Sequence, residues 1–282
     1  AEQDNWYLAK EFPGSKDYYS GVAYHEDNAT GVGKVYALIG NGSSNYVGVF
    51  DLNGTWDRNV TIANSRYYPK GLALDENGTI YVAEYAAVTC LENNGTFRWR
   101  TGKYADFSNY GSSGSGDGEF NQEINWSMGI ALGADGKVYV TDIYNHRVQV
   151  LENNGSFVRS FGTLGSAPGQ LNYPRDLVVL ADGTVVVADQ SYLHYFQADG
   201  TFVRRTSSGS YTVSLAKDGT LLSSTSLLDE DGTQLQYSSQ LFDSSTRTAF
   251  TSTGDLIVNR GGLKLYRRAY RTKGLPVPNV IP

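Results

Sequence analysis

The chain has 282 residues, a formal net charge of −6 at pH 7 and a sequence pI near 5.1. Because phosphate binding requires clustered Lys and Arg, this balance argues against a general nucleic-acid-binding role, and no apolar run approaches the ~20 residues that a membrane-spanning helix needs. The single cysteine, Cys90, excludes an intrachain disulfide, whereas 32 Gly and 21 Tyr against one Met favour an all-β chain of short strands and tight turns.

Six similar hairpins follow one another along the chain. Each combines a turn glycine with a strand pattern such as KVYVTD or TVVVAD, and the glycines are Gly33, Gly78, Gly136, Gly183, Gly219 and Gly254. Successive glycines are 35 to 58 residues apart. Repeats of about this length that contain only strands are typical of a β-propeller, in which each blade is a four-stranded meander.

A second turn glycine follows within five of the repeats and predicts the connection between the third and fourth strands. These glycines are Gly54, Gly95, Gly155, Gly200 and Gly232. The sixth repeat has three strand patterns and no comparable fourth. Because the N-terminal NWYLAKEFPG resembles FVRSFGTLG of the third blade, we expect residues 6–12 to supply the missing outer strand and to close the ring.

The C-terminal segment KGLPVPNVIP is rich in proline, which cannot donate a backbone hydrogen bond to a sheet. The sequence therefore predicts one propeller domain over residues 1–272 and an extended tail or linker over residues 273–282. The chain begins AEQDNW without Met. This start and the acidic charge favour a secreted or cell-surface module that is a monomeric part of a larger protein.

Two blades carry the motifs of a known family. GSGDGEFN and GSAPGQLN both follow the pattern Gly-x-x-x-Gly-x-apolar-Asn, each blade closes its second strand with Asp, and the third blade adds Asp-x-x-Asn-x-Arg over Asp142, Asn145 and Arg147. These features resemble the NHL repeat. The resemblance implies a six-bladed NHL-type β-propeller, in a family that ranges from protein-binding and RNA-binding platforms to more distant lyases and lactonases.

Three acidic residues occupy equivalent positions in successive blades. Glu84, Asp142 and Asp189 each lie six residues after the hairpin glycine, at corresponding ends of the second strands. As oxygen donors they are candidate ligands for a metal such as calcium. A carboxylate at such a position also accepts backbone N–H bonds and braces its own loop. The bracing role is the preferred interpretation, because the other three blades have Ile, Thr and Arg there.

The predicted recognition surface is a loop face over blades 2–4. Residues just before the first strands should meet the loops between second and third strands there, which makes the face aromatic with a few cations. The expected binding residues are Tyr68, Lys70, Tyr85, Trp126, Met128, Tyr144, His146, Arg147, Tyr173, Arg175 and Tyr192. Trp126 belongs to an insertion, EINWS. The same aromatic side chains would alternatively pack the junctions between blades.

These observations predict a non-catalytic scaffold that recognises a protein, peptide or glycan, with no cofactor and no nucleic-acid partner. The alternative is a metal-assisted lyase or lactonase that acts at the central channel with calcium or zinc. Zinc would need at least three converging ligands. The histidines are expected after the first strand of blade 1 (His25), in a loop of blade 3 (His146) and in the third strand of blade 4 (His194), which disfavours convergence.

Overall fold

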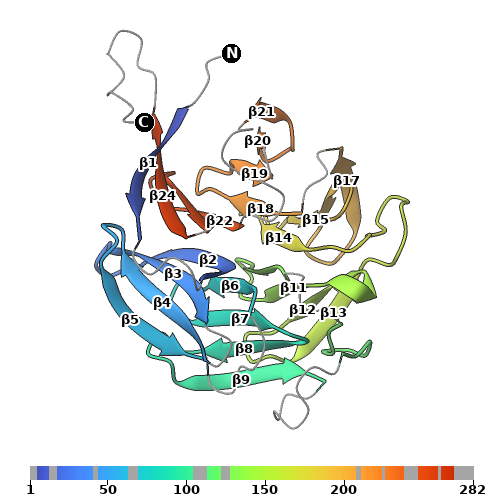
Figure 1. Ribbon diagram of the computed structural model, residues 1–282. Helices are drawn as coiled ribbons and strands as arrows, with labels where there is room; N and C mark the ends of the chain where they lie inside the picture. Colours follow the sequence, from blue (N-terminus) through green and yellow to red (C-terminus); the bar gives the residue numbers. More distant parts are fainter. Residues whose placement is uncertain are drawn as a thin grey trace.

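The computed structural model describes residues 5–12, 18–40, 44–62, 69–103, 113–121, 128–207, 211–223, 226–237, 247–259 and 262–269. These residues form six four-stranded antiparallel sheets around a central axis (Figure 1). The chain is an all-β, six-bladed propeller, as the hairpin repeats predict. Within the described part, the helical structure is the three-residue 3-10 turn η1 (Ile143–Asn145), and no helix has the length and apolar character of a membrane span.

The blades follow one another along the chain, each running from an inner to an outer strand. Blade 1 contains β2 (Tyr18–Glu26), β3 (Gly33–Gly40), β4 (Asn45–Asp51) and β5 (Trp56–Thr61), and blade 2 contains β6 (Gly71–Leu74), β7 (Ile80–Glu84), β8 (Ala87–Leu91) and β9 (Phe97–Gly102). Blade 3 contains β10 (Ile130–Leu132), β11 (Val138–Asp142), β12 (Arg147–Leu151) and β13 (Phe157–Phe161), and blade 4 contains β14 (Asp176–Val179), β15 (Val185–Ala188), β16 (Leu193–Phe196) and β17 (Phe202–Thr206). Blade 5 contains β18 (Val213–Leu215), β19 (Leu221–Ser223), β20 (Ser226–Leu228) and β21 (Gln234–Tyr237).

Blade 6 is completed from the other end of the chain. Its three consecutive strands are β22 (Arg247–Phe250), β23 (Leu256–Asn259) and β24 (Leu263–Ala269), and the N-terminal β1 (Asn5–Glu11) pairs antiparallel with β24 as the outer strand (Figure 1). The register runs from Asn5 opposite Ala269 to Glu11 opposite Lys264. The predicted N-terminal closure is confirmed. The predicted tail over residues 273–282 lies outside the described residues.

The first hairpin of blade 1 differs from its sequence alignment. Gly33 begins β3, whereas the glycine with the left-handed backbone that the turn requires is Gly31, with φ +66°. The other first-hairpin glycines are correctly placed; Gly78, for example, has φ +78° and donates its N–H to the carbonyl of Asp75. Blade 1 is out of register because its turn is longer and β2 has nine residues. His25 therefore lies within β2, not after it.

The hydrophobic core consists of separate clusters between neighbouring blades. Leu38 and Val47 of blade 1 pack with Ile80 and Val82 of blade 2, and similar clusters join each later pair and blade 6 to blade 1. The inner strands contact one another in the same order, and β2 touches both β6 and β22. Cys90 is fully buried in the cluster between blades 2 and 3, where it packs as a small core residue.

Glycines allow the inner strands of the first three blades to approach their neighbours closely. A Cβ atom at Gly71 would collide with the carbonyl oxygen of Met128, and one at Gly129 would collide with the backbone of Asp176. Gly21 is in a similar position against the carbonyl oxygen of Lys70. On this side of the axis the blades meet through backbone, because no side chain would fit.

Candidate recognition face and central channel

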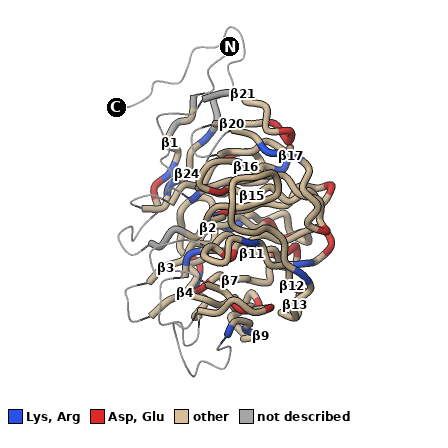
Figure 2. The backbone as a smooth tube through the Cα atoms, turned by 90° about the vertical axis from the view of Figure 1, so that its right-hand side faces the viewer, with Lys and Arg blue, Asp and Glu red and all other residues tan. Residues whose placement is uncertain are grey.

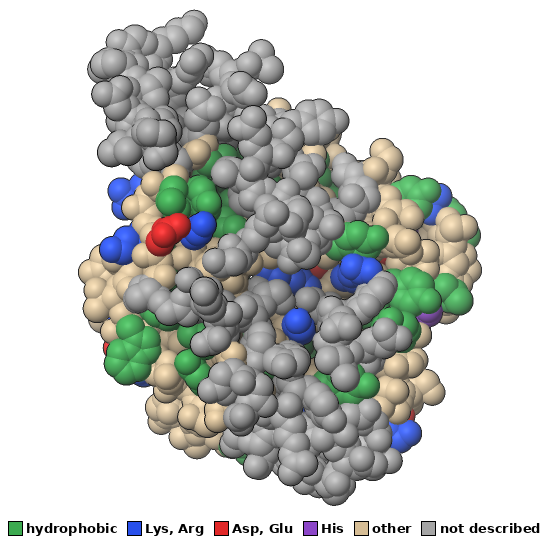
Figure 3. All heavy atoms as spheres, in the orientation of Figure 1, with side chains coloured by type: hydrophobic (Ala, Val, Ile, Leu, Met, Phe, Trp, Pro, Cys, Tyr) green, Lys and Arg blue, Asp and Glu red, His purple; other side chains and the backbone are tan. Residues whose placement is uncertain are grey.

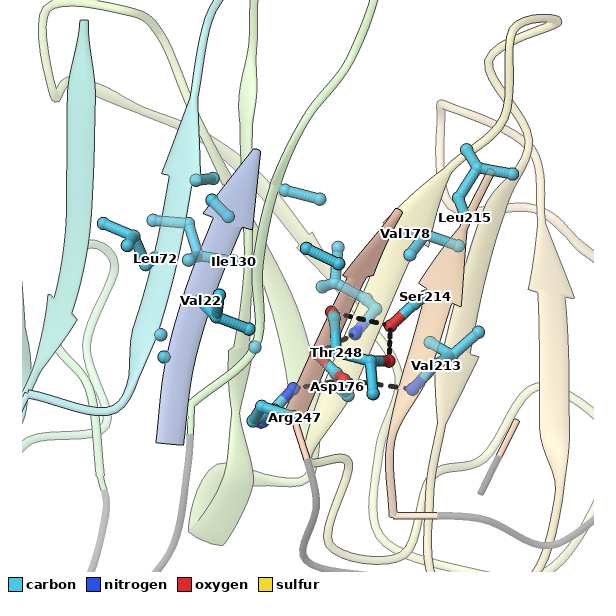
Figure 4. A pocket seen from close by; sticks show the side chains of 18 of the residues that line it. Val22, Leu72, Ile130, Asp176, Val178, Val213, Ser214, Leu215, Arg247 and Thr248 are labelled. Carbon is cyan, nitrogen blue, oxygen red and sulfur yellow. Dashed lines mark hydrogen bonds and ion pairs between the residues drawn. The ribbon is translucent and has the colours of Figure 1, made fainter. Parts of the chain in front are cut away.

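The six inner strands surround a central channel with a cavity of about 280 Å³. Its wall is largely apolar and includes Val22, Leu72, Ile130 and Val178, which come from four different blades (Figure 4). A polar seam interrupts the wall on one side, where Ser214 and Thr248 share a hydrogen bond of 2.5 Å. The charged residues among the described lining are Lys70, Asp176 and Arg247.

We use the term loop face for the end of the ring at which the inner strands begin. In an antiparallel blade the second strand ends at this same end, so the loops between second and third strands lie there too. Lys70 and Arg175 occupy equivalent positions one residue before β6 and β14, and their backbone N–H groups donate to Ala83 and Ala188 at 3.0 and 2.9 Å. The register predicted for these two residues is confirmed.

An ion pair between two inner strands lies across the channel. Its two residues occupy a register position at which blades 1–3 have glycine. In register, the same position is Gly71 at the start of β6, Gly129 just before β10, Asp176 at the start of β14 and Arg247 at the start of β22. The guanidinium of Arg247 binds the carboxylate of Asp176, and its Nη2 donates to the carbonyl of Arg175 at 3.0 Å (Figure 4). This pair joins two blades that are not neighbours.

Asp176 also binds the blade between its own and that of Arg247. Its Oδ2 accepts the N–H of Val213 at 3.0 Å, and its Oδ1 accepts the N–H of Leu177 at 3.1 Å. Burial raises the pKa of the Asp176 carboxyl, while the charge of Arg247 and these N–H groups oppose the rise. The carboxylate therefore depends on its partners to remain ionised in this site.

An aromatic row runs along the loop face from blade 3 to blade 5. His146 and Tyr173 have ring centroids 4.5 Å apart, and Tyr173 and Tyr144 have centroids 5.3 Å apart, both in edge-to-face geometry. The Arg175 guanidinium lies over the Tyr211 ring at 3.8 Å. Except for the buried His146, these side chains are half-buried. They combine accessible aromatic surface with a stacked cation, which is a composition typical of protein recognition sites.

The backbone of the row is held in an unusual conformation. His146 and Tyr173 have φ of +53° and +54°, in the left-handed region that non-glycine residues seldom adopt. The Tyr173 N–H donates to Nδ1 of His146 at 3.2 Å, which links the loop after η1 to the segment before β14. Because Nδ1 accepts this bond, the imidazole is neutral and carries its proton on Nε2. Burial lowers the pKa of the ring, which favours this neutral form.

The three candidate metal ligands are buried and accept hydrogen bonds from their own blades. Asp142 is 0% exposed, and its carboxylate accepts the N–H of Asn121 at 2.8 Å and the Nε of Arg147 at 2.8 Å. Asp189 is 1% exposed and accepts the N–H of Asn172 at 2.9 Å and of Tyr192 at 2.8 Å. The structure therefore favours the bracing interpretation for these two acids.

The family motif has a direct physical explanation in these contacts. The Asn that ends each lead-in pattern donates its backbone N–H to the acid that ends the second strand of the same blade. A third-strand side chain completes each site: Gln149 donates to Asp142 at 3.0 Å, His194 lies 2.9 Å from Asp189, and Thr89 donates to Glu84. Within the described residues, no group of three or more His, Cys, Asp or Glu is placed to hold a metal ion.

Several predicted binding residues have different positions from those expected. Met128 is 0% exposed and packs in the core between blades 2 and 3. Arg147 is committed to Asp142 and to the carbonyl of Gly116 at 2.7 Å. Neither side chain is available to a partner. Tyr68 and Trp126 lie outside the described residues.

The remaining predicted residues frame the aromatic row. Tyr85 is half-buried between β7 and β8, and Tyr192 is half-buried with the Arg205 guanidinium 4.1 Å from its ring centroid. The row itself spans blades 3–5, one blade beyond the predicted blades 2–4. Sequence reasoning missed Arg247 as a site residue. The sequence did contain a signal: at the register position of Gly71 and Gly129, blades 4 and 6 have charged residues instead of glycine.

The NHL repeat family model matches residues 129–151, which cover β10, β11, η1 and β12. The chain is 34% identical over 100 residues to Protein brain tumor of Drosophila melanogaster and 43% identical over 63 residues to RING finger protein nhl-1 of Caenorhabditis elegans. These segments cover 34% and 22% of this chain but 9% and 6% of the relatives. The chain thus matches less than a tenth of the length of each relative.

Solved structures share the fold at low sequence identity. A streptogramin B lyase structure has a TM-score of 0.61 at 14% identity and covers 94% of this chain and 98% of that one. Virginiamycin B lyase from Staphylococcus aureus has a TM-score of 0.60 at 11% identity, covering 95% and 100%. A chain of a nidogen/laminin complex has a TM-score of 0.55 at 16% identity, covering 78% and 80%. At these identities the likeness shows the fold alone.

Proposed function

This chain belongs to the NHL-repeat β-propellers, and from that premise we propose that it is a non-catalytic binding module that recognises a protein through its loop face. The observation that carries the proposal is the row formed by His146, Tyr173, Tyr144, Arg175 and Tyr211. Large aromatic side chains and Arg supply most of the binding energy in protein interfaces. Here they are already packed against one another, so binding would order few additional side chains.

The charged groups around the row support binding over catalysis. Asp142, Asp189 and Arg147 are each engaged in hydrogen bonds that brace loops. A general acid or base must reach a proton on the substrate. These carboxylates are covered by their own blades, so they accept hydrogen bonds from those blades and do not face a substrate on the surface. The alternative, a metal-assisted lyase or lactonase, draws support from the shared fold, and among the described residues that line the channel none forms a group of metal ligands.

A protein partner suits the row better than a glycan or a nucleic acid. The row is continuous over three blades, which matches the extended contact that a folded surface or peptide makes. Its single stacked guanidinium provides little of the clustered positive charge that nucleic acid requires. The monomeric state, the larger parent protein and the secreted or cell-surface location stay predictions of the sequence.

A photo-crosslinking amino acid placed at Tyr144 tests the proposal. Installed in the full chain and exposed to an extract of the producing cells, it should capture a defined protein partner. Tyr144→Ala and Arg175→Ala should each weaken binding of that partner by roughly 10-fold or more, since truncating a central interface residue costs about 2 kcal/mol.

The matched control is Trp56, an aromatic residue that is 54% exposed at the start of the outer strand β5. The crosslinker at position 56 should not capture the same protein, and Trp56→Ala should leave affinity unchanged. If both positions capture the same proteins, or if the partner binds Tyr144→Ala as well as wild type, the loop face is not the recognition surface.

A further inference from the structure

One motif recurs in the first three blades and takes no part in the recognition face. Asn-x-Ser/Thr, with x other than Pro, is the acceptor pattern for N-linked glycans, in which an oligosaccharide is attached to the Asn side chain. The pattern does not occur after Ser156. Its asparagines are Asn28, Asn41, Asn53, Asn59, Asn77, Asn94, Asn125 and Asn154, of which Asn41 and Asn125 lie outside the described residues.

Most of the described asparagines of this pattern lie at the end of the ring opposite the loop face. Because the strands of a blade alternate in direction, the turn between first and second strands shares that end with the turn between third and fourth strands. Figure 2 shows the ring from its edge, with Asp and Glu residues at several such turns. We call the turns with the pattern acceptor turns; they contain the exposed residues Asn28, Asn53, Asn77, Asn94 and Asn154.

The hydrogen bonding of these turns does not by itself require asparagine. Oδ1 of Asn94 accepts the N–H of Thr96 at 2.9 Å, and the equivalent turns of blades 1 and 3 make the same bond. In blade 4, Oδ1 of Asp199 accepts the N–H of Thr201 at 2.8 Å. Asn and Asp therefore serve the turn equally, because the bond uses a side-chain oxygen that both residues have. Only Asn has the amide nitrogen, Nδ2, to which a glycan can be linked.

An acidic residue lies two positions before the Asn of every acceptor turn. The turn uses the carbonyl of this residue: the N–H of Gly95 donates to the carbonyl of Glu92 at 2.8 Å, and Gly200 donates to Gln197 at 2.9 Å in blade 4. An acidic side chain is therefore not needed for the turn. The acids of the acceptor turns are Glu26, Asp51, Asp75, Glu92 and Glu152. In turns with Asp instead of Asn, the same position is Gly133, Leu180, Gln197, Ala216 or Asp229.

The acidic side chains are accessible at the surface of the turns. Oε1 of Glu92 lies 3.4 Å from Nε of Arg98, and 48% of the Glu92 side chain is exposed. Oε2 of Glu152 lies 3.7 Å from Nζ of Lys137, with 46% exposed. Exposed ion pairs of this kind add little to stability. They are therefore a weak structural reason for an acid at this position, and they leave the carboxylates within reach of another protein.

We infer that blades 1–3 carry N-linked glycans on the Asn residues of the acceptor turns, attached by an oligosaccharyltransferase that recognises the acidic residue together with Asn-x-Ser/Thr. In the transfer, Nδ2 of the Asn forms a bond to C1 of the first sugar and loses one proton to a base of the transferase. The bond from C1 to the phosphate oxygen of a lipid pyrophosphate donor breaks, and the lipid pyrophosphate leaves. A cationic side chain of the transferase would bind the acid.

Glycans on the acceptor turns would leave the recognition face uncovered. Figure 3 shows hydrophobic, Lys and Arg side chains on the loop face around the axis of the ring. A glycan is bulky and solubilising, and here it would cover the other end of blades 1–3. The inference goes beyond the proposed function, and it requires the secreted or cell-surface location that the sequence predicts.

Mass spectrometry of the full chain, purified from the cells that produce it, tests the inference. Peptides that contain Asn94 or Asn154 should carry the added mass of an oligosaccharide, and electron-transfer fragmentation should place it on that residue. Asn153 is the matched control, because it is exposed in the same turn as Asn154 but is not followed by Ser or Thr two positions later. It should carry no sugar.

Variants produced in the same cells test the role of the acid. Glu92→Gln keeps Asn94-Gly95-Thr96 intact and should lose the glycan from Asn94. Asn94→Asp should lose it too while the turn bond is kept, as Asp199 shows in blade 4. Melting curves of both variants show that the chain remains folded.

The turn of blade 4 allows the converse experiment. Gln197→Glu combined with Asp199→Asn gives this turn the full pattern and should add a glycan, whereas Asp199→Asn alone should not. The inference is wrong if no acceptor turn carries sugar, if Glu92→Gln keeps full occupancy, or if the two blade 4 variants are glycosylated alike. Asn94→Asp should bind the crosslinked partner normally, so loss of the glycans would not affect the proposed function.

Discussion

His146 shows at the level of one residue how a surface loop becomes rigid. Its left-handed backbone, with φ +53°, ends η1, and its Nδ1 accepts the N–H of Tyr173 from the next blade. A protonated imidazole could not accept this bond. The structure therefore requires the neutral ring, and burial lowers its pKa while the charge of Asp142 opposes the change.

We expect the free energy of unfolding to fall as the pH is lowered from 7.5 to 5.5. A histidine whose pKa is depressed in the folded state contributes stability above its unfolded pKa, near 6.5, and loses that contribution as the pH drops below it. Burial also lowers the pKa of His25, so two histidines contribute to this loss of stability. Urea unfolding at the two pH values measures the loss.

His146→Gln separates the two contributions. The Gln side-chain oxygen can still accept the Tyr173 N–H but does not titrate, so this variant should lose less stability on acidification than wild type. His25→Gln should reduce the loss through the other histidine, and the two substitutions together should remove most of it. An unchanged pH dependence in His146→Gln would show that the hydrogen bond to Tyr173 does not control this loop.

Strand β1 is the element on which closure of the ring depends. It pairs with β24 along most of its length, and the residue that follows it, Phe12, is 3% exposed with its ring centroid 5.6 Å from that of Phe50 in blade 1. The Phe12 N–H donates to the carbonyl of Leu263 at 2.9 Å. One short segment thus completes blade 6 and packs it against blade 1.

Deleting residues 1–12 should strongly lower the melting temperature, because it removes an outer strand and a buried aromatic residue together. Phe12→Ala should cost about 3–5 kcal/mol, as is usual for truncating a buried Phe. Leu8→Ala on the same strand is the control: Leu8 is 46% exposed, so its truncation should cost less than about 0.5 kcal/mol. Chemical denaturation measures both, and equal costs would mean that Phe12 is not the anchor.

At the scale of the whole molecule, the pair formed by Asp176 and Arg247 couples blades 4, 5 and 6. The outer strands of these blades include Leu235 at 57% exposure, and the sequence repeats of blades 5 and 6, like that of blade 1, are degenerate. A buried ion pair gives little net stability over an apolar substitute, but removal of one partner leaves an unpaired charge. The ion pair therefore contributes to the stability of the fold only while both residues are present.

A double-mutant cycle tests this coupling. Asp176→Ala and Arg247→Ala should each lower the free energy of unfolding by about 3–5 kcal/mol, whereas the double variant should lose clearly less than the sum. Guanidinium unfolding of the four proteins measures the interaction energy. Additive losses would mean that the two residues stabilise the ring independently and that the pair does not join the blades.

The fold was predictable from sequence because its signals are local. Turn glycines such as Gly78 and the alternation around them mark each hairpin, and the unpaired sixth repeat indicates that β1 closes the ring. The exact register of blade 1 was not predictable, since its longer turn places Gly31, not Gly33, in the left-handed conformation. A longer turn does not change the alternating pattern of the strands, so the shift in the position of the turn glycine cannot be detected from the repeat alignment.

The site was only partly predictable, because it depends on contacts between distant segments. Lys70 and Arg175 were found from their common register. Arg247 lies 72 residues beyond Arg175, and only the closed ring brings the two together. Met128 was misplaced for a related reason: the register of a lead-in residue shows where it lies along the blade but not whether its side chain turns into the core.

The glycines that let blades 1–3 meet through backbone have a consequence for docking. A propeller of six similar blades allows a partner bound on its axis six nearly equivalent rotational orientations. Here Gly21, Gly71 and Gly129 form a bare half of the rim, and Asp176, Thr212 and Arg247 form a half with side chains. The rim is therefore asymmetric around the axis, and a partner that contacts both halves can bind this ring in only one rotational orientation.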